Sequence, residues 1–152
     1  MTFLVKIFLI TVHRGVRKSD GWHHELLEYK TSAGKTFTVE VSGKLEGATA
    51  HQLALTGLGE ALDRLGKPCE LEIYTDSRYL ESAFRQQWVS KWQKDGWKNA
   101  KGEPVKNAGL WREICGKARS HSVNITFSEH TEYTEWQRMQ IRHAMKKEDK
   151  NV

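Results

Sequence analysis

The sequence predicts a mixed α/β fold, a five-stranded mixed sheet with helices on its faces. Three short strand-like runs follow one another near the N-terminus, which favours an antiparallel meander. Two more strand-like runs come later, and segments with helical periodicity lie between and around them. The predicted order is βββαβαβα, with additional short helices between the fourth and fifth strands. This order indicates a single domain over residues 1–152.

The first three strands are predicted from β-branched and aromatic residues. They span residues 3–12, 22–30 and 36–44. A basic loop over residues 13–21 joins the first two, and Asp20-Gly21 is interpreted as part of this turn. The three runs are too close together for helical crossovers, so we expect neighbouring strands to pair antiparallel.

The later elements begin with a helix over residues 48–65, where apolar residues recur at helical spacing. Gly66-Lys67-Pro68 ends this helix. Asp76-Ser77 can cap the helix that follows the fourth strand. In chain order, the remaining predictions are strand 70–75, helix 77–85, short helix 88–94, helix 108–119, strand 123–128 and an amphipathic helix over 132–147, with residues 146–152 as a frayed tail.

The composition is that of an ordinary globular protein, with 38% hydrophobic and 28% charged residues. The formal net charge of +5 permits binding to a polyanion such as nucleic acid, or to an anionic membrane surface. Many basic proteins simply carry solvated lysines, so the placement of the charge matters more than its total.

Two features bear on the compartment. Cys69 and Cys115 are far apart and form no CxxC pattern, so we expect a reducing compartment in which both are small core residues. The apolar start over residues 1–12 is interrupted by Lys6 and is too short to span a bilayer. We interpret it as a buried strand and expect a cytoplasmic protein without membrane contact.

A segment in the middle of the chain is rich in lysine and tryptophan. Lysines neutralise phosphates and release counterions, while an aromatic ring can pack against a sugar or base. Alternatively, the tryptophans belong to the core and the lysines form a solvated face. The candidate nucleic-acid-binding residues are Trp88, Lys91, Trp92, Lys94, Trp97, Lys98, Lys101 and Lys106. Trp111, on a helix face, is expected to be core.

Three motifs follow one another between residues 70 and 114. A strand ends in Thr75-Asp76-Ser77, a helix follows, and then come W-x3-W-x4-W-K from Trp88, PVKN over residues 104–107, and Leu110-Trp111. This stretch resembles ribonuclease HI, in which a strand ending in TDS precedes a Trp- and Lys-rich protrusion that binds hybrids. The resemblance covers most of the chain, strongly in the middle and weakly at both ends, and it implies the ribonuclease H-like fold.

Ribonuclease HI cuts the RNA strand of an RNA/DNA hybrid with four carboxylates that hold two divalent metals. Hard cations such as Mg²⁺ prefer oxygen ligands, and a single carboxylate cannot hold such a pair. By resemblance, the four positions are occupied here by Ile10, His51, Asp76 and Gln140. The resemblance therefore implies a protein that keeps one of the four catalytic acids.

The resemblance also assigns positions around this site. Arg78 replaces a family glutamine and can attract a phosphate, whereas Glu46 stands in a stretch that contacts the hybrid in the family and would repel one. His130 matches a histidine in a mobile loop that helps to release product in the family.

Other interpretations of these residues stay open. Asp76 can be a helix N-cap, or a metal ligand together with His51. Glu132 or Glu135 can reach a metal if the last helix is shifted. His23-His24 cannot chelate one metal jointly, because neighbouring strand residues point to opposite faces.

Three functions are consistent with the sequence. The first is a module that binds duplex or RNA/DNA hybrid nonspecifically without cutting it, with no cofactor. The second is a divergent ribonuclease H that uses Mg²⁺ or Mn²⁺. The third is a scaffold for an unknown protein partner. Cleavage that disappears in Asp76→Asn would single out the second.

Overall fold

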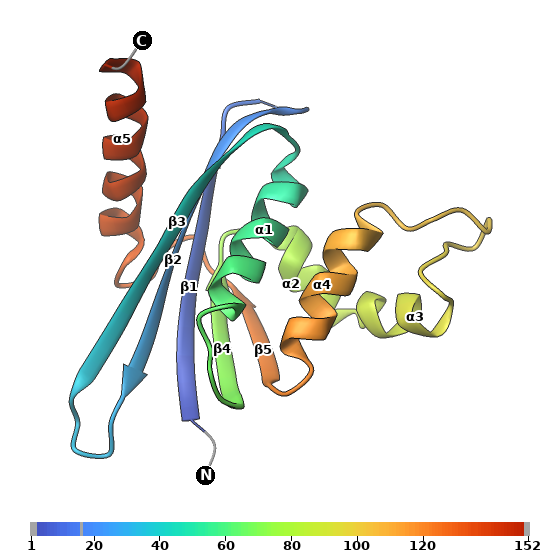
Figure 1. Ribbon diagram of the computed structural model, residues 1–152, viewed down its shortest axis with the longest axis horizontal. Coiled ribbons are helices and arrows are strands. Elements are labelled where there is room, and N and C mark those ends of the chain that lie inside the picture. Colours follow the sequence, from blue (N-terminus) through green and yellow to red (C-terminus); the bar gives the residue numbers. More distant parts are fainter. Residues whose placement is uncertain (1–2, 16, 151–152) are drawn as a thin grey trace.

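The computed structural model describes residues 3–15 and 17–150, and its main feature is one five-stranded sheet in the order β3-β2-β1-β4-β5 (Figure 1). The strands are β1 (Phe3–His13), β2 (Ser19–Lys30), β3 (Thr36–Ala48), β4 (Cys69–Thr75) and β5 (Ser122–Phe127). The first three pair antiparallel, whereas β4 pairs parallel with both β1 and β5. The predicted mixed sheet is therefore confirmed.

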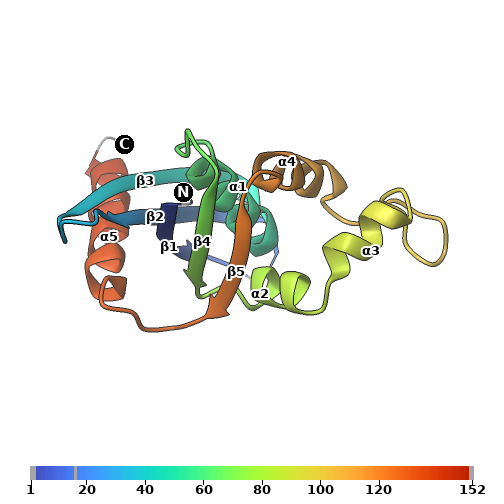
Figure 2. The same cartoon turned by 90° about the horizontal axis from the view of Figure 1, so that it is seen from below.

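Helices cover both faces of this sheet. They are α1 (Ala50–Leu62), α2 (Arg78–Arg85), α3 (Trp88–Lys94), α4 (Ala108–Ala118) and α5 (Thr134–Lys150). Helices α1 and α4 lie on one face, and α5 lies on the other, as Figures 1 and 2 show from two directions. Helix α3 and the loop after it extend away from the sheet.

The two-sided cover follows from alternation along β1. Val5, Ile7 and Leu9 point into the main core under α1, because every second residue of a strand faces the same side. Ile10 points the other way and packs with Trp22 and Ile141 under α5. No polar residue interrupts this run from Ile7 to Ile10, as expected for a strand covered on both faces.

Several predicted boundaries are wrong. Strand β3 runs to Ala48 and not to residue 44, and α1 spans Ala50–Leu62 and not residues 48–65. Strand β2 begins at Ser19 with an irregular register, so Asp20 lies within the strand and not in a turn. Helix α5 continues to Lys150, where a frayed tail was expected from residue 146. Lys44 contacts both segments, since its ammonium group lies 3.8 Å from Asp20 and 2.9 Å from Glu148. Residues 151–152 lie outside the described part of the chain.

Two further findings concern the compartment. In the described part of the chain, no helix is long and apolar enough to cross a membrane. Cys69 is buried, Cys115 is half-buried, and both are free thiols.

Candidate nucleic-acid interface and carboxylate site

The basic protrusion, defined here as residues 88–106, is a folded feature held by backbone hydrogen bonds. The Trp97 amide donates to the Trp92 carbonyl at 2.7 Å, and the Val105 amide donates to the Trp97 carbonyl at 2.9 Å. A β-bridge joins Lys98 to Pro104 and closes the base of the loop. The protrusion therefore presents its side chains from a defined backbone.

The tip of this loop is stabilised by one side chain. The carboxamide oxygen of Asn99 accepts hydrogen bonds from the amides of Lys101 and Glu103, at 2.9 and 3.0 Å. Gly102 between them has φ +78°, a left-handed conformation that costs glycine little. An asparagine that bonds the amides ahead of it is a common way to order a turn.

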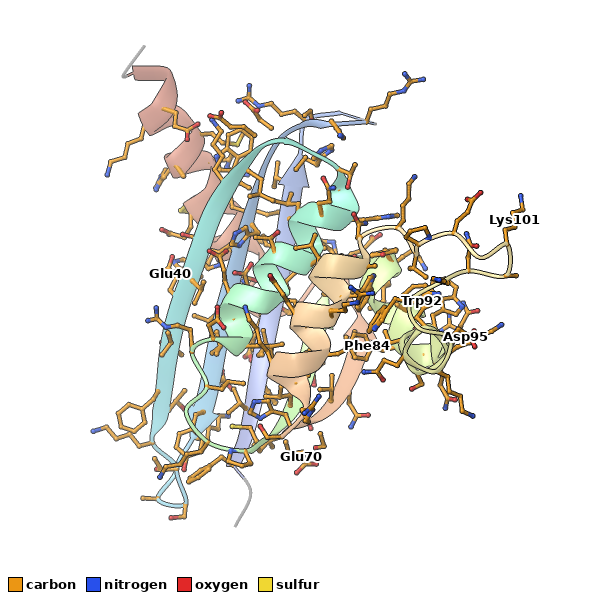
Figure 3. All side chains as sticks on the ribbon, turned by 45° about the vertical axis from the view of Figure 1, so that its right-hand side comes forward. Glu40, Glu70, Phe84, Trp92, Asp95 and Lys101 are labelled. Atoms are coloured by element: carbon orange, nitrogen blue, oxygen red, sulfur yellow. The ribbon has the colours of Figure 1, made fainter. Side chains whose placement is uncertain are left out.

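The three tryptophans of the protrusion face the body of the protein. Trp88, Trp92 and Trp97 are half-buried and pack against the main core. The ring of Trp92 lies 5.7 Å from that of Trp111, which is fully buried as predicted. In Figure 3, Trp92 lies where the protrusion meets the body, near Phe84. These rings attach the protrusion to the body of the protein, in agreement with the alternative interpretation in which the tryptophans belong to the core.

The lysines of the protrusion face solvent. Lys101 lies at its outer end in Figure 3. The exposed lysines of the protrusion are Lys91, Lys94, Lys98, Lys101 and Lys106. Because only Asp95 and Glu103 oppose them within this segment, the protrusion carries a net positive charge of the kind that attracts phosphates.

Asp76 lies at the carboxyl end of β4, directly beside β1. Leu9 pairs with Thr75 across these two parallel strands, so Ile10 and Asp76 follow at the same edge. One carboxylate oxygen of Asp76, Oδ2, accepts from the Thr11 amide at 3.4 Å. The other, Oδ1, is buried and has no hydrogen-bond partner among the described residues. Ser77, not Asp76, caps α2 through a 3.2 Å bond to the Leu80 amide.

Burial raises the pKa of Asp76 to about 6, although the Thr11 amide and the charge of Arg138 act in the opposite direction. A raised pKa and an unsatisfied carboxylate oxygen are typical of functional sites. Arg138 comes from α5, at the position one turn before Ile141. Hence the α5 side chain that acts electrostatically on Asp76 is a cation.

The other positions implied by the resemblance do not gather around Asp76 as ligands. Ile10 is buried with Trp22 and Ile141 and has no donor atom. His51 is exposed and stacks on Tyr79 with ring centroids 3.7 Å apart. Burial, and then the charge of Lys106, lower the pKa of His51.

Gln140 lies elsewhere. It lines a cavity of about 240 Å³ between α5 and strands β2 and β3, together with Trp22, His24 and Lys44. Position 140 thus faces away from the edge where Asp76 lies, whereas Arg138 faces toward it. Sequence counting missed Arg138, which helical spacing from the buried Gln137 and Ile141 places on the sheet-facing side of α5.

These residues do not fit a two-metal centre. Two hard cations need several carboxylate ligands, and Asp76 is the one acid among the four positions. The free carboxylate oxygen of Asp76 can accept a proton or contact a single cation. Ile10, however, supplies no ligand, and the positive charge of Arg138 repels a metal cation. Glu132 and Glu135 are exposed.

Two remaining candidates lie at the surface. The Arg78 guanidinium stacks over the Phe127 ring at 4.0 Å, which fixes an exposed cation two residues beyond Asp76. His130 is exposed, and the Ser128 hydroxyl donates to its backbone carbonyl at 2.9 Å. Arg78 is therefore placed where it can contact a phosphate, while no contact of the His130 ring indicates a role.

Curated proteins resemble this chain in sequence. A ribonuclease H of Lachnoclostridium phytofermentans is 34% identical over 121 residues, which cover 80% of this chain and 77% of that protein. A ribonuclease H of Symbiobacterium thermophilum is 42% identical over 84 residues, covering 55% of this chain and 57% of that protein. The chain thus spans between about half and three quarters of these relatives.

Solved structures share the fold. LC9-RNase H1, a type 1 RNase H with the type 2 active-site motif, superposes with a TM-score of 0.77 at 23% identity, over 92% of this chain and 71% of that one. The foamy viral protease-reverse transcriptase in complex with an RNA/DNA hybrid superposes with a TM-score of 0.65 at 15% identity, over 90% of this chain and 19% of that one. The RNase H family profile matches residues 18–147. Together with the sheet order, this match shows that the chain belongs to the RNase H family.

Proposed function

We propose that this chain is a member of the RNase H family that holds duplex nucleic acid or RNA/DNA hybrid through the basic protrusion without cleaving it efficiently. The observation that carries the proposal is the arrangement of side chains within residues 88–106. The tryptophans pack against the core, and the lysines are exposed to solvent. A fixed backbone supports the cations, so little order has to be gained on binding.

Binding of this kind is governed by counterion release. If the five protrusion lysines neutralise about five phosphates, the slope of log affinity against log salt is about −4 to −5. Affinity would then fall a few hundred-fold between about 50 and 200 mM salt. Because lysines contact phosphates and not base edges, we expect little preference for sequence.

The carboxylate site supports the absence of efficient cleavage. Hydrolysis by two metals needs a group of acids, and three of the four positions hold Ile10, His51 and Gln140. The charge on α5 that acts on Asp76 is instead that of the cation Arg138. We therefore expect hybrid binding through the basic protrusion to need no divalent metal, in contrast to metal-dependent cleavage.

A second function is favoured by two observations. Relatives at 34% and 42% identity are ribonucleases H, and Asp76 keeps a free, buried carboxylate oxygen. A divergent Mg²⁺- or Mn²⁺-dependent ribonuclease with a rearranged site is therefore the alternative to test.

We also propose that the chain acts as one domain in a reducing compartment such as the cytoplasm. Two free thiols, one of them buried, support the compartment. The continuous five-stranded sheet supports the single domain.

The discriminating experiment is a cleavage assay on an end-labelled RNA/DNA hybrid. Wild-type protein and Asp76→Asn are incubated in excess over the hybrid, with Mg²⁺, with Mn²⁺ and with chelator. We expect intact hybrid in every lane and an equal shift of its mobility on a native gel. Cleavage that needs Asp76 would overturn the proposal in favour of the divergent nuclease.

A further inference from the structure

A second group of titratable side chains lies between β2 and α1, where His23 pairs across the sheet with Thr11, whose amide contacts Asp76. The His23 ring bridges two carboxylates, with Nδ1 2.9 Å from Glu25 and Nε2 2.6 Å from Glu60. The side chains of His23 and Glu25 are 1% and 0% exposed, whereas Glu60 is 46% exposed. Strand alternation explains the pairing, because residues 23 and 25 share the face under α1.

The charge of this group is not balanced by its own members. Burial raises the pKa of Glu25 to about 7, with His23 opposing and Glu60 adding to the shift. Burial lowers the pKa of His23, but the hydrogen bonds and charges of Glu25 and Glu60 outweigh it and raise the pKa overall. With both glutamates ionised, the net charge of the trio is −1 or −2. A buried carboxylate is costly unless a cation compensates it.

Two glycines make room for these side chains, which pack directly against the glycine backbone. A Cβ at Gly43 would lie 2.7 Å from the His23 Nε2 atom, and a Cβ at Gly57 would lie 2.7 Å from a Glu25 carboxylate oxygen. Gly57 lies inside α1, where glycine costs about 1 kcal/mol relative to alanine. The close approach of Glu25 accounts for a glycine at this unfavourable place.

We propose that His23, Glu25 and Glu60 bind one divalent transition-metal cation of the Zn²⁺ type. One ligand atom from each residue lies within 4.8 Å of the other two. Four-coordinate zinc keeps its ligand atoms about 3.4 Å apart. The 2.9 and 2.6 Å contacts of His23 must therefore open when the metal enters, while wider separations, up to 4.8 Å, must close. Glu60, half-exposed on α1, is the side chain with freedom to move and the route of entry.

The donor set favours a transition metal over Mg²⁺. One imidazole nitrogen with two carboxylates is the mixed N/O set of Zn²⁺, Mn²⁺ or Fe²⁺ sites, whereas Mg²⁺ takes oxygens and water. A dication with neutral His23 and two ionised glutamates brings the net charge to zero. A protonated His23 must release its proton when the metal binds, so binding weakens in acid.

The opposite face of β2 offers a matched control. His24 Nε2 lies 2.7 Å from Glu40, and their side chains are 1% and 45% exposed, nearly the values of His23 and Glu60. Its other ring nitrogen lies 3.1 Å from the neutral Gln137 amide, so the His24 ring contacts a single carboxylate. Figure 3 labels Glu40 on β3. The pair therefore differs from the trio mainly in lacking a second acid.

The test compares metal binding by wild-type protein, Glu60→Gln and Glu40→Gln after treatment with chelator. One equivalent of Zn²⁺ should raise the thermal midpoint of wild type and of Glu40→Gln by about 5 °C or more, and that of Glu60→Gln by much less. Co²⁺ should give the visible absorption of four-coordinate cobalt in the first two proteins. Zinc titrations in buffers of different ionisation enthalpy should show proton release.

Equal responses of all three proteins, or uptake of less than one equivalent by wild type, would overturn the proposal and leave a proton-bridged trio. Glu25→Gln serves as a second variant and should also lose zinc binding. Circular dichroism checks that each variant is folded. None of these measurements uses nucleic acid, so the result is independent of the proposed function.

Discussion

The basic protrusion and the edge of β1 and β4 where Asp76 lies differ in whether their charged residues are exposed or buried. In the protrusion, the charges lie outside and the aromatic rings hold the backbone, and no residue of α3 is fully buried. At the edge of β1 and β4, the one retained acid is largely enclosed, and its neighbour Ile10 is part of an apolar cluster. We therefore expect substitutions in the protrusion to change binding without changing stability, whereas substitutions at the edge should change both.

Under the proposed function, this difference explains how a catalytic site can be lost while a binding surface is kept. A buried carboxylate cluster is costly without the cations that it binds, whereas a hydrophobic residue at one of its positions becomes part of the core. Solvated lysines place no such demand on the fold, because water stabilises them in the free protein. The following variants test this contrast, from the largest expected effect to the smallest.

Placing an acid at position 10 should cause the largest loss of stability. Ile10→Asp places a carboxylate between Trp22 and Ile141, where no partner compensates it. We expect a loss of about 3–5 kcal/mol in the free energy of unfolding, measured by urea denaturation. Ile10→Val, which removes one methylene, should cost about 1 kcal/mol. An aspartate tolerated at no cost would show that this edge still accommodates an acid.

Reversing the charge of the protrusion should act on binding alone. In the triple variant Lys94→Glu, Lys98→Glu and Lys101→Glu, hybrid affinity at low salt should fall about a hundred-fold or more, and its salt dependence should flatten. The free energy of unfolding should change by less than about 0.5 kcal/mol. Fluorescence anisotropy with labelled hybrid measures the affinity.

The control for this variant makes the same change in net charge elsewhere. Lys30, Lys35 and Lys67 are also exposed but lie outside the protrusion. Their replacement by glutamate should weaken binding far less. Equal losses in the two triple variants would mean that net charge, not the protrusion, governs affinity.

Trp92 separates packing from base stacking. Its ring lies 5.7 Å from Trp111 and 6.1 Å from Trp88. Trp92→Ala should lower the free energy of unfolding by about 2 kcal/mol, since the residue is half-buried. Hybrid affinity of the folded variant should change by no more than about threefold, because packed rings offer little face to a base. A large loss of affinity at unchanged stability would assign Trp92 to the nucleic acid.

Asp76→Asn should give the smallest effect and the opposite sign. The pKa of Asp76 is about 6 in the folded protein, above the ordinary value of 3.8. The folded state therefore binds more protons than the unfolded state between these values, and stability falls as pH rises through that window. Asparagine removes this loss, so the variant should be more stable by about 1–2 kcal/mol at pH 7.5.

The same comparison at lower pH provides the check. At about pH 4, wild type and Asp76→Asn should unfold at similar urea concentrations. A variant that is less stable at pH 7.5 would show that the Asp76 carboxylate makes stabilising contacts that outweigh its burial.

Much of the fold was predictable because it rests on periodicity. Strand alternation, helical spacing and the motif from Asp76 to Trp111 fixed the element order and the family. The exposed lysines were predictable for the same reason. Side-chain neighbours across elements were not, since they depend on register. Counting from His130 placed Gln140 at the site, whereas the packing of α5 brings Arg138 toward Asp76.

Local rules were also insufficient for buried polar groups. The sequence showed that His23 and His24 point to opposite faces, and the structure bears this out. It did not show that Glu25 is fully enclosed beside His23, because a glutamate in a strand is usually solvated. A histidine and a glutamate two residues apart in an otherwise apolar strand are the signal that could have found this group.

The contact between Glu25 and Gly57 makes these two positions depend on each other through mutation. Any side chain at position 57 would collide with the Glu25 carboxylate, while a glycine opposite a small residue would leave a void in α1. Each change alone is therefore expected to produce a less stable protein than both together. The arrangement can be left with least loss of stability only by altering both residues, which a double-mutant cycle would measure as an energetic coupling between positions 25 and 57.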